Sequence, residues 1–443
     1  MKSEIIIKTS PGGSCHLVIH PIKAAEIGLR KEKFTVISFG NQKCYVKIVI
    51  NDQISPEHLL LSEKLITAFQ LPDYPVYEIS FAHQELVIGP YIGLLLSKES
   101  RRLTPSSLKK MLVYAREYST LHGVLVVFAL DKVNRAERFI EGYGYDPIRN
   151  GWREGEFPYP SAIYRTVGLS EEWKNHFLSA IGDNIFNSRY FNKWQMYQWF
   201  SNDRVLSPHI PYTVLYSSPQ DVLAMLEKFQ KVYLKPVSGL RGHGIVRISA
   251  ANPLFIFKYH ENHENYSITL ENSNKARQYI QEHFAHGRYL IQQAVDLLEH
   301  QGGVVDFRCV VQKDQFNVWI CRAIIGRAGG KGSIVSNISS GGSAFPAQEL
   351  LKKVLAVPEK DVFAIEEKIT ALALNVCNTL NDYGIHCGTL GLDIGVDKTG
   401  QLWLIEINNR DPDPTIALDI QDQELYHALK TGPLFYAKFL AGF

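Results

Sequence analysis

Residues 389–408 read TLGLDIGVDKTGQLWLIEIN, and this stretch decides the fold of the chain. Apolar residues alternate with glycine or aspartate over residues 390–396, as expected for a half-buried strand. Residues 397–400 have the composition of a turn, and residues 402–408 return as a second strand. The stretch therefore predicts a β-hairpin.

Three oxygen-bearing side chains fall on one face of this predicted hairpin. With a two-residue tip at 398–399, Asp393 lies opposite Leu404. Glu406 is then its diagonal neighbour, about 7–8 Å away between Cα atoms, and Asn408 continues the face. Two carboxylates and an amide oxygen are ligands that Mg²⁺ prefers, and the glycines flanking Asp393 are expected to leave room for phosphates. The alternative at this point is an ordinary solvated hairpin face.

Composition bounds what the chain can be. Its 443 residues, 45% of them hydrophobic, are enough for two to four globular domains. The net charge of +2 argues for neither nucleic acid nor an anionic membrane as a partner, and six scattered cysteines argue against a zinc site or a disulfide framework. Because the N-terminal apolar run is too short for a signal peptide and no run approaches the length of a membrane span, we expect a cytoplasmic protein.

Two further units are predicted in the N-terminal part of the chain. Short β-patterned runs separated by turn residues fill residues 1–87 and predict a small β-barrel-like module. Residues 88–178 change to a strand, helix and strand pattern, with a capped helix expected at 106–122. Arg165 follows a third apolar strand there, and it is either a ligand contact or a surface arginine.

A third unit, residues 179–443, carries the other candidates. A helical stretch is expected over 170–200 and contains Lys193. Residues 231–248, KVYLKPVSGLRGHGIVRI, predict two strands joined by a glycine-rich loop whose amides could face a phosphate, with Lys235 and Arg241 adding charge. The alternative is a plain hairpin turn.

The rest of this unit reads as a meander and packing helices. YLIQQAVDLL (289–298), residues 306–311 and residues 317–325 are expected strands, and the long polar loop that follows them at 326–343 carries Arg327 and Asn337. The apolar spacing at 361–383 predicts a helix packed under the hairpin, and one or two more helices follow residue 415.

Taken together, these motifs resemble those of ATP-grasp enzymes. Lys193, the YLKP–glycine loop, the YLIQQAVDL strand, the DFR element and the LD…IEIN pair occur in the same order, from about residue 186 to the end. Within that superfamily, KPVSGLRGHGIVRI, DFRCVVQKD, the NISSGG loop and GLDIGVDKTGQLWLIEIN resemble the YheC/YheD group of endospore coat-associated proteins. The resemblance implies an α+β fold in which two α+β subdomains clasp ATP, with a lid subdomain at about 205–292. The β-barrel-like module and a short Rossmann-like pre-ATP-grasp domain precede it.

The resemblance also implies roles for individual residues, with ATP and Mg²⁺ as ligands. Lys193 and Lys235 are expected to bind the phosphates, and the loop residues Ser238, Gly239, Arg241, Gly242 and Gly244 to cover the triphosphate. The strand residues Gln292, Gln293 and Val295 are expected to read the adenine edge, and Glu299 to hold the ribose. Asp393, Glu406 and Asn408 would hold one or two Mg²⁺ ions. Arg308, Arg327 and Asn337 would stabilise the transferred phosphoryl group or hold an acidic substrate.

The function implied is a carboxylate–amine ligase that acts through an acyl phosphate, for example by adding an amino acid to a peptide or protein acceptor. The alternatives are an ATP-binding scaffold of the spore coat without turnover, and a kinase-type transfer to a hydroxyl. One departure concerns residues 409–414, NRDPDP, because many ATP-grasp relatives reach a small residue and a proline sooner. The extra acidic residue in this run is expected to alter the substrate side of the site more than the metal side.

Overall fold

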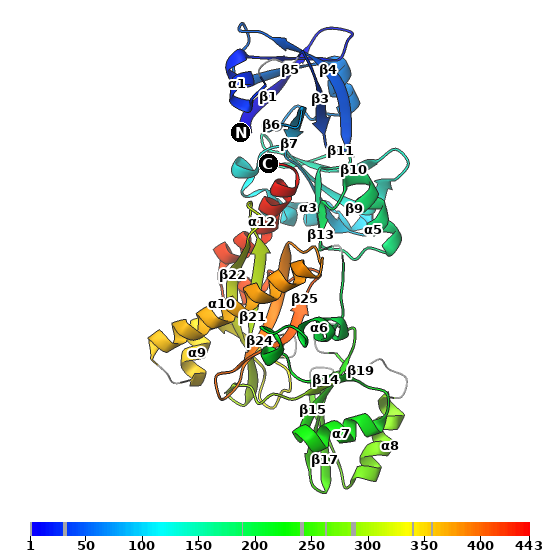
Figure 1. Cartoon of the computed structure of the whole chain (residues 1–443), viewed down its shortest axis with the longest axis vertical. Coiled ribbons are helices and arrows are strands. Elements are labelled where there is room, and N and C mark those ends of the chain that lie inside the picture. Colours follow the sequence, from blue (N-terminus) through cyan, green and yellow to red (C-terminus); the bar gives the residue numbers. More distant parts are fainter. Residues whose placement is uncertain are drawn as a thin grey trace.

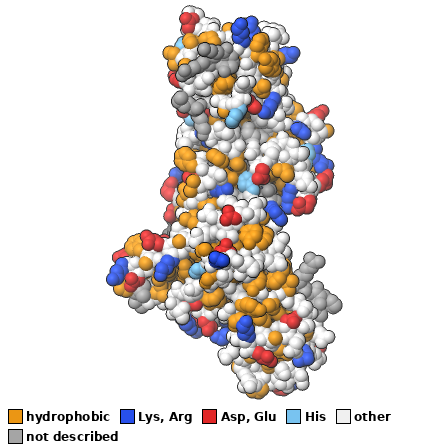
Figure 2. Space-filling model, in the orientation of Figure 1, with side chains coloured by type: hydrophobic (Ala, Val, Ile, Leu, Met, Phe, Trp, Pro, Cys, Tyr) orange, Lys and Arg blue, Asp and Glu red, His pale blue; other side chains and the backbone are white. Residues whose placement is uncertain are grey.

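The computed structural model describes residues 2–29, 33–187, 189–239, 243–261, 264–284, 289–338, 341–355 and 358–443. Its strands form four successive β-sheets along an elongated molecule, with the N-terminal sheet at one end and the sheet that contains β15 at the other (Figure 1). Charged side chains of both signs are interspersed over the visible face (Figure 2), in keeping with the small net charge. No helix of the described residues is long and apolar enough to cross a membrane.

The first sheet is a closed barrel, which confirms the predicted β-barrel-like module. Its strand order is β1-β5-β2-β4-β3-β7-β6, so that β1 and β6 close the sheet on itself. Apolar residues that alternate along the strands point inward and build the core. The elements are β1 (Lys2–Ser10), β2 (His16–Ile19), α1 (Pro21–Ile27), β3 (Phe34–Phe39), β4 (Gln42–Ile50), β5 (His58–Ser62), α2 (Glu63–Phe69), β6 (Tyr77–Ala82) and β7 (Glu85–Gly89).

The second sheet is mixed, with the order β11-β10-β9-β8-β12-β13. Strand β8 runs parallel to β9 and β12, and β9, β10 and β11 form an antiparallel meander. The strands are β8 (Tyr91–Ser97), β9 (Val124–Asn134), β10 (Phe139–Asp146), β11 (Gly151–Pro158), β12 (Ala162–Arg165) and β13 (Ile185–Phe186).

Two predicted helices of this region are wrong in their extent. The segment 106–122 is divided into α3 (Pro105–Met111), η2 (Leu112–Ala115) and α4 (Tyr118–Leu121), following a 3₁₀ turn η1 (Ser100–Arg102). Packing against the C-terminal helix overrides the helical propensity there. The segment 170–200 is α5 (Glu171–Ile181), β13 and α6 (Lys193–Phe200), because Gly182 ends α5 at φ +68° and the buried Ile185 and Phe186 pair with β12.

The third sheet has the order β14-β19-β15-β16-β17-β18 and packs against two helices. The elements of this region, in chain order, are η3 (Ser207–His209), β14 (Thr213–Leu215), α7 (Pro219–Phe229), β15 (Lys231–Pro236), β16 (Val246–Ala251), β17 (Leu254–Glu261), β18 (Glu264–Leu270), α8 (Ser273–Phe284) and β19 (Tyr289–Gln293).

The fourth sheet has the order β23-β22-β21-β24-β25, with β20 beside β21. Its elements are β20 (Glu299–His300), β21 (Gly303–Lys313), β22 (Trp319–Ala328), β23 (Ser343–Pro346), α9 (Ala347–Leu355), α10 (Glu359–Asp382), β24 (Thr389–Val396), β25 (Leu402–Asn408) and α11 (Ile416–Asp419). Helix α10 matches the helix predicted at 361–383 and buries its apolar stripe in the core of this sheet.

The last helix, α12 (Gln423–Leu440), connects three of these units. It contacts β21 of the fourth sheet and β8 and β12 of the second. Lys430 donates to the Tyr114 hydroxyl at 3.2 Å, and Lys438 donates to the Thr120 carbonyl at 2.8 Å and pairs with Glu78 of the barrel. The Phe443 ring lies where a side chain on Gly89 would be.

Candidate functional site

The predicted hairpin exists, but its register differs from the prediction. The loop has three residues between Asp397 and Gln401, with Gly400 at φ +86°, so Ile394 lies opposite Leu404. A β-bulge then shifts the ladder by one more residue, and Asp393 lies directly opposite Glu406. A shift of the strand register by one residue moves a side chain to the other face of the sheet, and a second shift moves it back. Since the loop and the bulge each shift the register once, both carboxylates remain on the same face.

The expectation that glycines beside Asp393 leave room for phosphates is wrong. A Cβ on Gly391 would lie 2.9 Å from Cβ of Pro412, and one on Gly395 would lie 2.5 Å from Cδ2 of Leu297. The space is therefore used for close packing within the protein.

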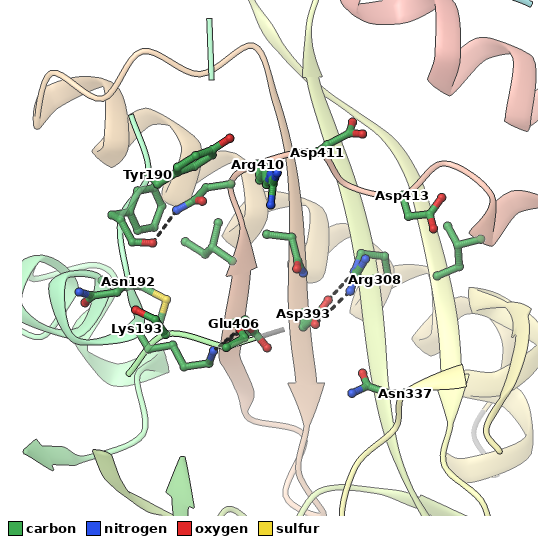
Figure 3. Close-up of a pocket in the computed structure, with 18 of the residues that line it drawn as sticks. Tyr190, Asn192, Lys193, Arg308, Asn337, Asp393, Glu406, Arg410, Asp411 and Asp413 are labelled. Atoms are coloured by element: carbon green, nitrogen blue, oxygen red, sulfur yellow. Dashed lines mark hydrogen bonds and ion pairs between the residues drawn. The ribbon is translucent and has the colours of Figure 1, made fainter. Parts of the chain in front are cut away.

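Asp393 is held by two arginines. Arg308 lies directly opposite it on β21, and its Nε is 2.5 Å from Oδ1 of Asp393 (Figure 3). Arg327 is 3.0 Å from Oδ2 of the same carboxylate. Burial alone would raise the pKa of Asp393, but the charges and hydrogen bonds of the two arginines outweigh it and lower the pKa, so the carboxylate is ionised.

Glu406 is paired with Lys193 from α6. The Nζ of Lys193 is 3.0 Å from Oε1 of Glu406 (Figure 3). It also donates to the Gly239 carbonyl at 3.2 Å. Lys193 therefore links Glu406 of β25 to the loop after β15. A cation in this position can exchange its carboxylate for a phosphate oxygen.

An inner cavity lies between the third and fourth sheets. Lys235 enters it from β15, is almost fully buried, and donates to Oε1 of Gln292 at 2.6 Å. The Nε2 of Gln292 in turn donates to the Thr213 hydroxyl at 3.1 Å. Burial lowers the pKa of Lys235 to about 8, although Glu406 and Asp393 partly oppose the shift. The remaining lining includes Tyr233, Gln293, Val295, Leu297 and Ile334.

A larger outer cavity of about 1120 Å³ opens on the other side of the carboxylates. It is lined by α6, by the loop after β15 and by residues 407–416. Five of the residues 409–414, singled out as a departure in the sequence, line it, namely all but Pro412, and Figure 3 shows Arg410, Asp411 and Asp413 around its upper part. Burial raises the pKa of Asp411 to about 6, and the Tyr164 hydroxyl donates to it at 3.2 Å.

The structure brings most of the predicted residues to these two cavities. Ser238 and Gly239 line the outer cavity, Gln292, Gln293 and Val295 line the inner one, and Arg327 and Asn337 line both. Arg241 and Gly242 lie outside the described residues. Gly244 has φ +72° at a turn and lines neither cavity.

Two further candidates line neither cavity. Glu299 is exposed, because the chain leaves the third sheet after Gln293 and Glu299 pairs with Val304 in the short strand β20. Arg165 is fully buried, and its guanidinium stacks on the Tyr190 ring, with Cζ 4.6 Å from the ring centroid. Neither of its two sequence-based interpretations foresaw a buried arginine.

The sequence did not reveal that Asp306 holds Arg327 in place. Asp306 lies directly opposite Arg327 in the β21–β22 ladder and accepts from its Nε at 2.7 Å and its Nη2 at 2.6 Å. Ser336 donates to the same carboxylate at 2.5 Å. Asp306 precedes Arg308 by two residues in the DFR element, so the alternation of a strand was the signal that placed both side chains on one face.

The side chains present fit a magnesium ion that binds together with a nucleotide. No three His, Cys, Asp or Glu residues of the described chain converge on a metal position. The oxygens that would hold the ion are those of the Asp393 and Glu406 carboxylates and the Oδ1 of Asn408, all at the outer cavity. Mg²⁺ is typically held by one or two carboxylates while phosphates and water complete its shell.

Comparison with known proteins identifies a family for the C-terminal part of the chain. Residues 182–440 match the family model described as YheC/D-like ATP-grasp. The chain is 29% identical over 367 residues to the endospore coat-associated protein YheD of Bacillus subtilis (strain 168), covering 80% of this chain and 79% of that protein. It is 22% identical over 274 residues to YheC of the same organism, covering 60% and 74%.

Solved structures of low sequence identity overlap the chain as well. D-alanyl-alanine synthetase A from Vibrio cholerae is 11% identical, with 78% of this chain and 99% of that chain covered and a TM-score of 0.41. The VanG D-Ala:D-Ser ligase from Enterococcus faecalis is 11% identical, with 78% and 98% covered and a TM-score of 0.45. Since the family model spans more than half of the 443 residues, the chain belongs to the YheC/D-like ATP-grasp family.

Proposed function

We propose that this protein is an ATP- and Mg²⁺-dependent ligase that joins a carboxylate to an amine. The observation that supports this most directly is the position of Asp393 and Glu406, which line both the inner and the outer cavity. The inner cavity, of about 80 Å³, has room for only part of a nucleotide, so the phosphates would extend past these carboxylates and meet an acid in the outer cavity. Phosphoryl transfer requires such a meeting point more than it requires a protein nucleophile.

The inner cavity supplies the groups that an adenine nucleotide needs. Backbone groups of the residues that follow β19, such as Val295, can read a base edge, and Lys235 provides a buried cation for the phosphates. Lys193 provides a second cation from the opposite side. Mg²⁺ held by Asp393, Glu406 and Asn408 would neutralise charge on the β- and γ-phosphates.

The residues between the cavities orient the reacting groups. Arg308 and Asn337 reach this junction from β21 and the 329–338 loop, and Arg327 is fixed there by Asp306. A carboxylate oxygen of the acid attacks the γ-phosphorus, and ADP leaves. The amine nitrogen then attacks the acyl carbon, phosphate leaves, and the proton lost from nitrogen passes to solvent, giving an amide, ADP and phosphate. The arginines stabilise the charge of the transferred group.

The acceptor that we propose is a peptide or protein segment. The outer cavity of about 1120 Å³ is larger than the roughly 300–1,000 Å³ of most small-molecule sites. Both curated relatives are named as endospore coat-associated proteins, which supports an acceptor connected with the coat.

The test is turnover with a panel of acids and amines, followed by ADP release and by mass spectrometry of the product. With ATP labelled by ¹⁸O at the β–γ bridge, the correct acid alone is expected to scramble the label, because the acyl phosphate forms reversibly before the amine arrives. Glu406→Gln should remove both signals, while Glu227→Gln, on the exposed side of α7, should keep them. ATP binding without turnover across the panel would instead favour the scaffold, and a phosphorylated product would favour a kinase.

A further inference from the structure

Strand β22 has an unpaired edge along half of its length. It pairs with β21 from Trp319 to Ala328, but β23 covers only Ile325 to Ala328 on the other side. Among the described residues, no strand and no other backbone hydrogen bond occupies that side of residues 319–324. Such an edge presents unused N–H and C=O groups, which are the groups that an added strand would pair with.

A groove of about 490 Å³ runs along this edge. Its first wall is the edge itself, residues 321–324. Its second wall is one face of α10, since the lining residues recur every three to four positions: Phe363, Glu366, Glu367, Thr370, Ala371 and Leu374. Neither wall belongs to the inner or the outer cavity.

We propose that this groove binds an extended, basic peptide segment that adds to β22 as a further strand, in line with β23. The lengths of the two walls agree with a short strand. Four strand residues span about 13 Å, and the α10 face from Phe363 to Leu374 spans about 17 Å. A segment of four or five residues therefore fits between them.

Arg322 adds an independent sign of a missing partner. It is the extra residue of a β-bulge, because Val310 pairs with Ala323 and Val311 pairs with Cys321. Its Nε is buried and has no hydrogen-bond partner among the described residues. A buried N–H without an acceptor is costly, and a carbonyl of an added strand would supply one.

The charges of the helix wall specify the side chains of the ligand. Glu367 is exposed and forms no ion pair with a described residue, and Glu366 shares only a 2.8 Å hydrogen bond with Gln348. A lysine or arginine of the peptide that points toward α10 would meet these two carboxylates. The exposed Phe363 offers an apolar contact beside them.

A free peptide fits this groove better than a second copy of the chain does. If two copies joined their β22 edges across a two-fold axis, both α10 helices would lie on the same face of the joined sheet. Each groove already has a helix as one wall, so the second copy would bring a further helix to that face. An extended peptide brings only a strand. Arg327 lies five residues further along β22, about 17 Å away, so a docked peptide would leave the carboxylates accessible.

The experiment uses the full chain and a fluorescein-labelled hexapeptide, Val-Lys-Thr-Lys-Val-Lys, in fluorescence anisotropy. Saturable binding is expected. N-methylation of the alternate backbone amides that face one edge should abolish it, whereas N-methylation of the other set should not, since only one edge of the peptide meets β22. The analogue with glutamate in place of lysine should bind at least about tenfold more weakly.

Charge reversal provides the matched test on the protein. Glu366→Lys and Glu367→Lys should each weaken binding about tenfold, and Glu227→Lys on α7 should not. Absent binding, equal loss from both N-methylated sets, or indifference to the α10 reversals would overturn the proposal. A change of oligomeric state in the α10 variants, seen by sedimentation, would assign the edge to a second copy instead. Nucleotide binding, measured on the same samples, keeps this outcome separate from that of the proposed ligase.

Discussion

Asp393 and Glu406 face one another directly across the β24–β25 ladder, because a three-residue loop and a β-bulge each shift the register by one residue. Directly opposed residues have Cα atoms about 4.5–5.5 Å apart, closer than a diagonal pair. Each carboxylate is engaged by cations of the same site, Arg308 and Arg327 on one and Lys193 on the other. The two carboxylates are therefore paired with three cations before any ligand arrives.

Substituting the two carboxylates should separate catalysis from stability. Glu406→Gln, at a partly exposed position, is expected to lower ADP formation by about 10²–10³-fold with little change in the free energy of unfolding. Asp393→Asn should lower it as much and also destabilise the fold by about 3–5 kcal/mol, since it leaves the largely buried Arg308 without an anionic partner, whereas Arg327 keeps Asp306. Turnover and urea unfolding of both variants check this, and equal unfolding of the two would contradict it.

Nucleotide affinity should depend on pH through Lys235. The pKa of about 8 means that this lysine is charged below pH 8 and increasingly neutral above it. Because phosphates bind the charged form, the Kd for ADP should rise toward tenfold per pH unit between about pH 8 and 9.5, and binding there should take up a proton. Calorimetry in buffers of different ionisation enthalpy measures both. Lys235→Arg should bind with a flat profile, and an unchanged slope in that variant would assign the titration to another group.

Asp306 should act through Arg327 as a positioning residue. Asp306→Asn removes the charge that fixes the guanidinium at 2.6 and 2.7 Å, so Arg327 should lose its orientation. The expected result is a fall in kcat of about 10²-fold with a nearly unchanged KM for ATP, because misplacement of a group by about 1 Å has an effect of this size. A loss confined to KM would show that Asp306 serves nucleotide binding instead.

The close contact at Gly395 should couple hairpin packing to the inner cavity. Gly395→Ala would push against Leu297, which lines that cavity, and overpacking of this kind costs about 1–3 kcal/mol. Weaker nucleotide binding and a lower Tm are expected together. The control is Gly400→Ala at the hairpin tip, which has open space but a φ of +86°, and which should lower Tm alone.

Local patterns in the sequence were sufficient for the hairpin, the barrel strands and helix α10, because alternation, turn residues and 3–4 spacing act over short distances. The register was not predictable in this way. The bulge after Asp393 depends on the pairing of Arg308 with Asp393 and on packing across three strands. The clamp of Asp306 on Arg327 likewise appears only once β21 and β22 are aligned.

Two other differences have a similar cause. Glu299 follows an apolar strand as a ribose-binding residue would, but the bridge between Leu297 and Asp397 turns the chain, and Glu299 faces outward. The segment 170–200 has helical composition throughout, yet burial of Ile185 and Phe186 in an edge strand divides it. In both places contacts between distant residues outweigh the local preference.

Helix α12 acts as a brace between the N-terminal units and the metal face. It is fastened to the barrel at Glu78, to η2 at Tyr114, to β8 and β12 of the second sheet, and to β21, the strand that carries Arg308. These parts would thus move together as one rigid body. The third sheet has no principal contact with α12, so it would be the part that moves when ATP enters or ADP leaves. A spectroscopic label on α7 would then report nucleotide exchange, while one on the barrel would remain silent.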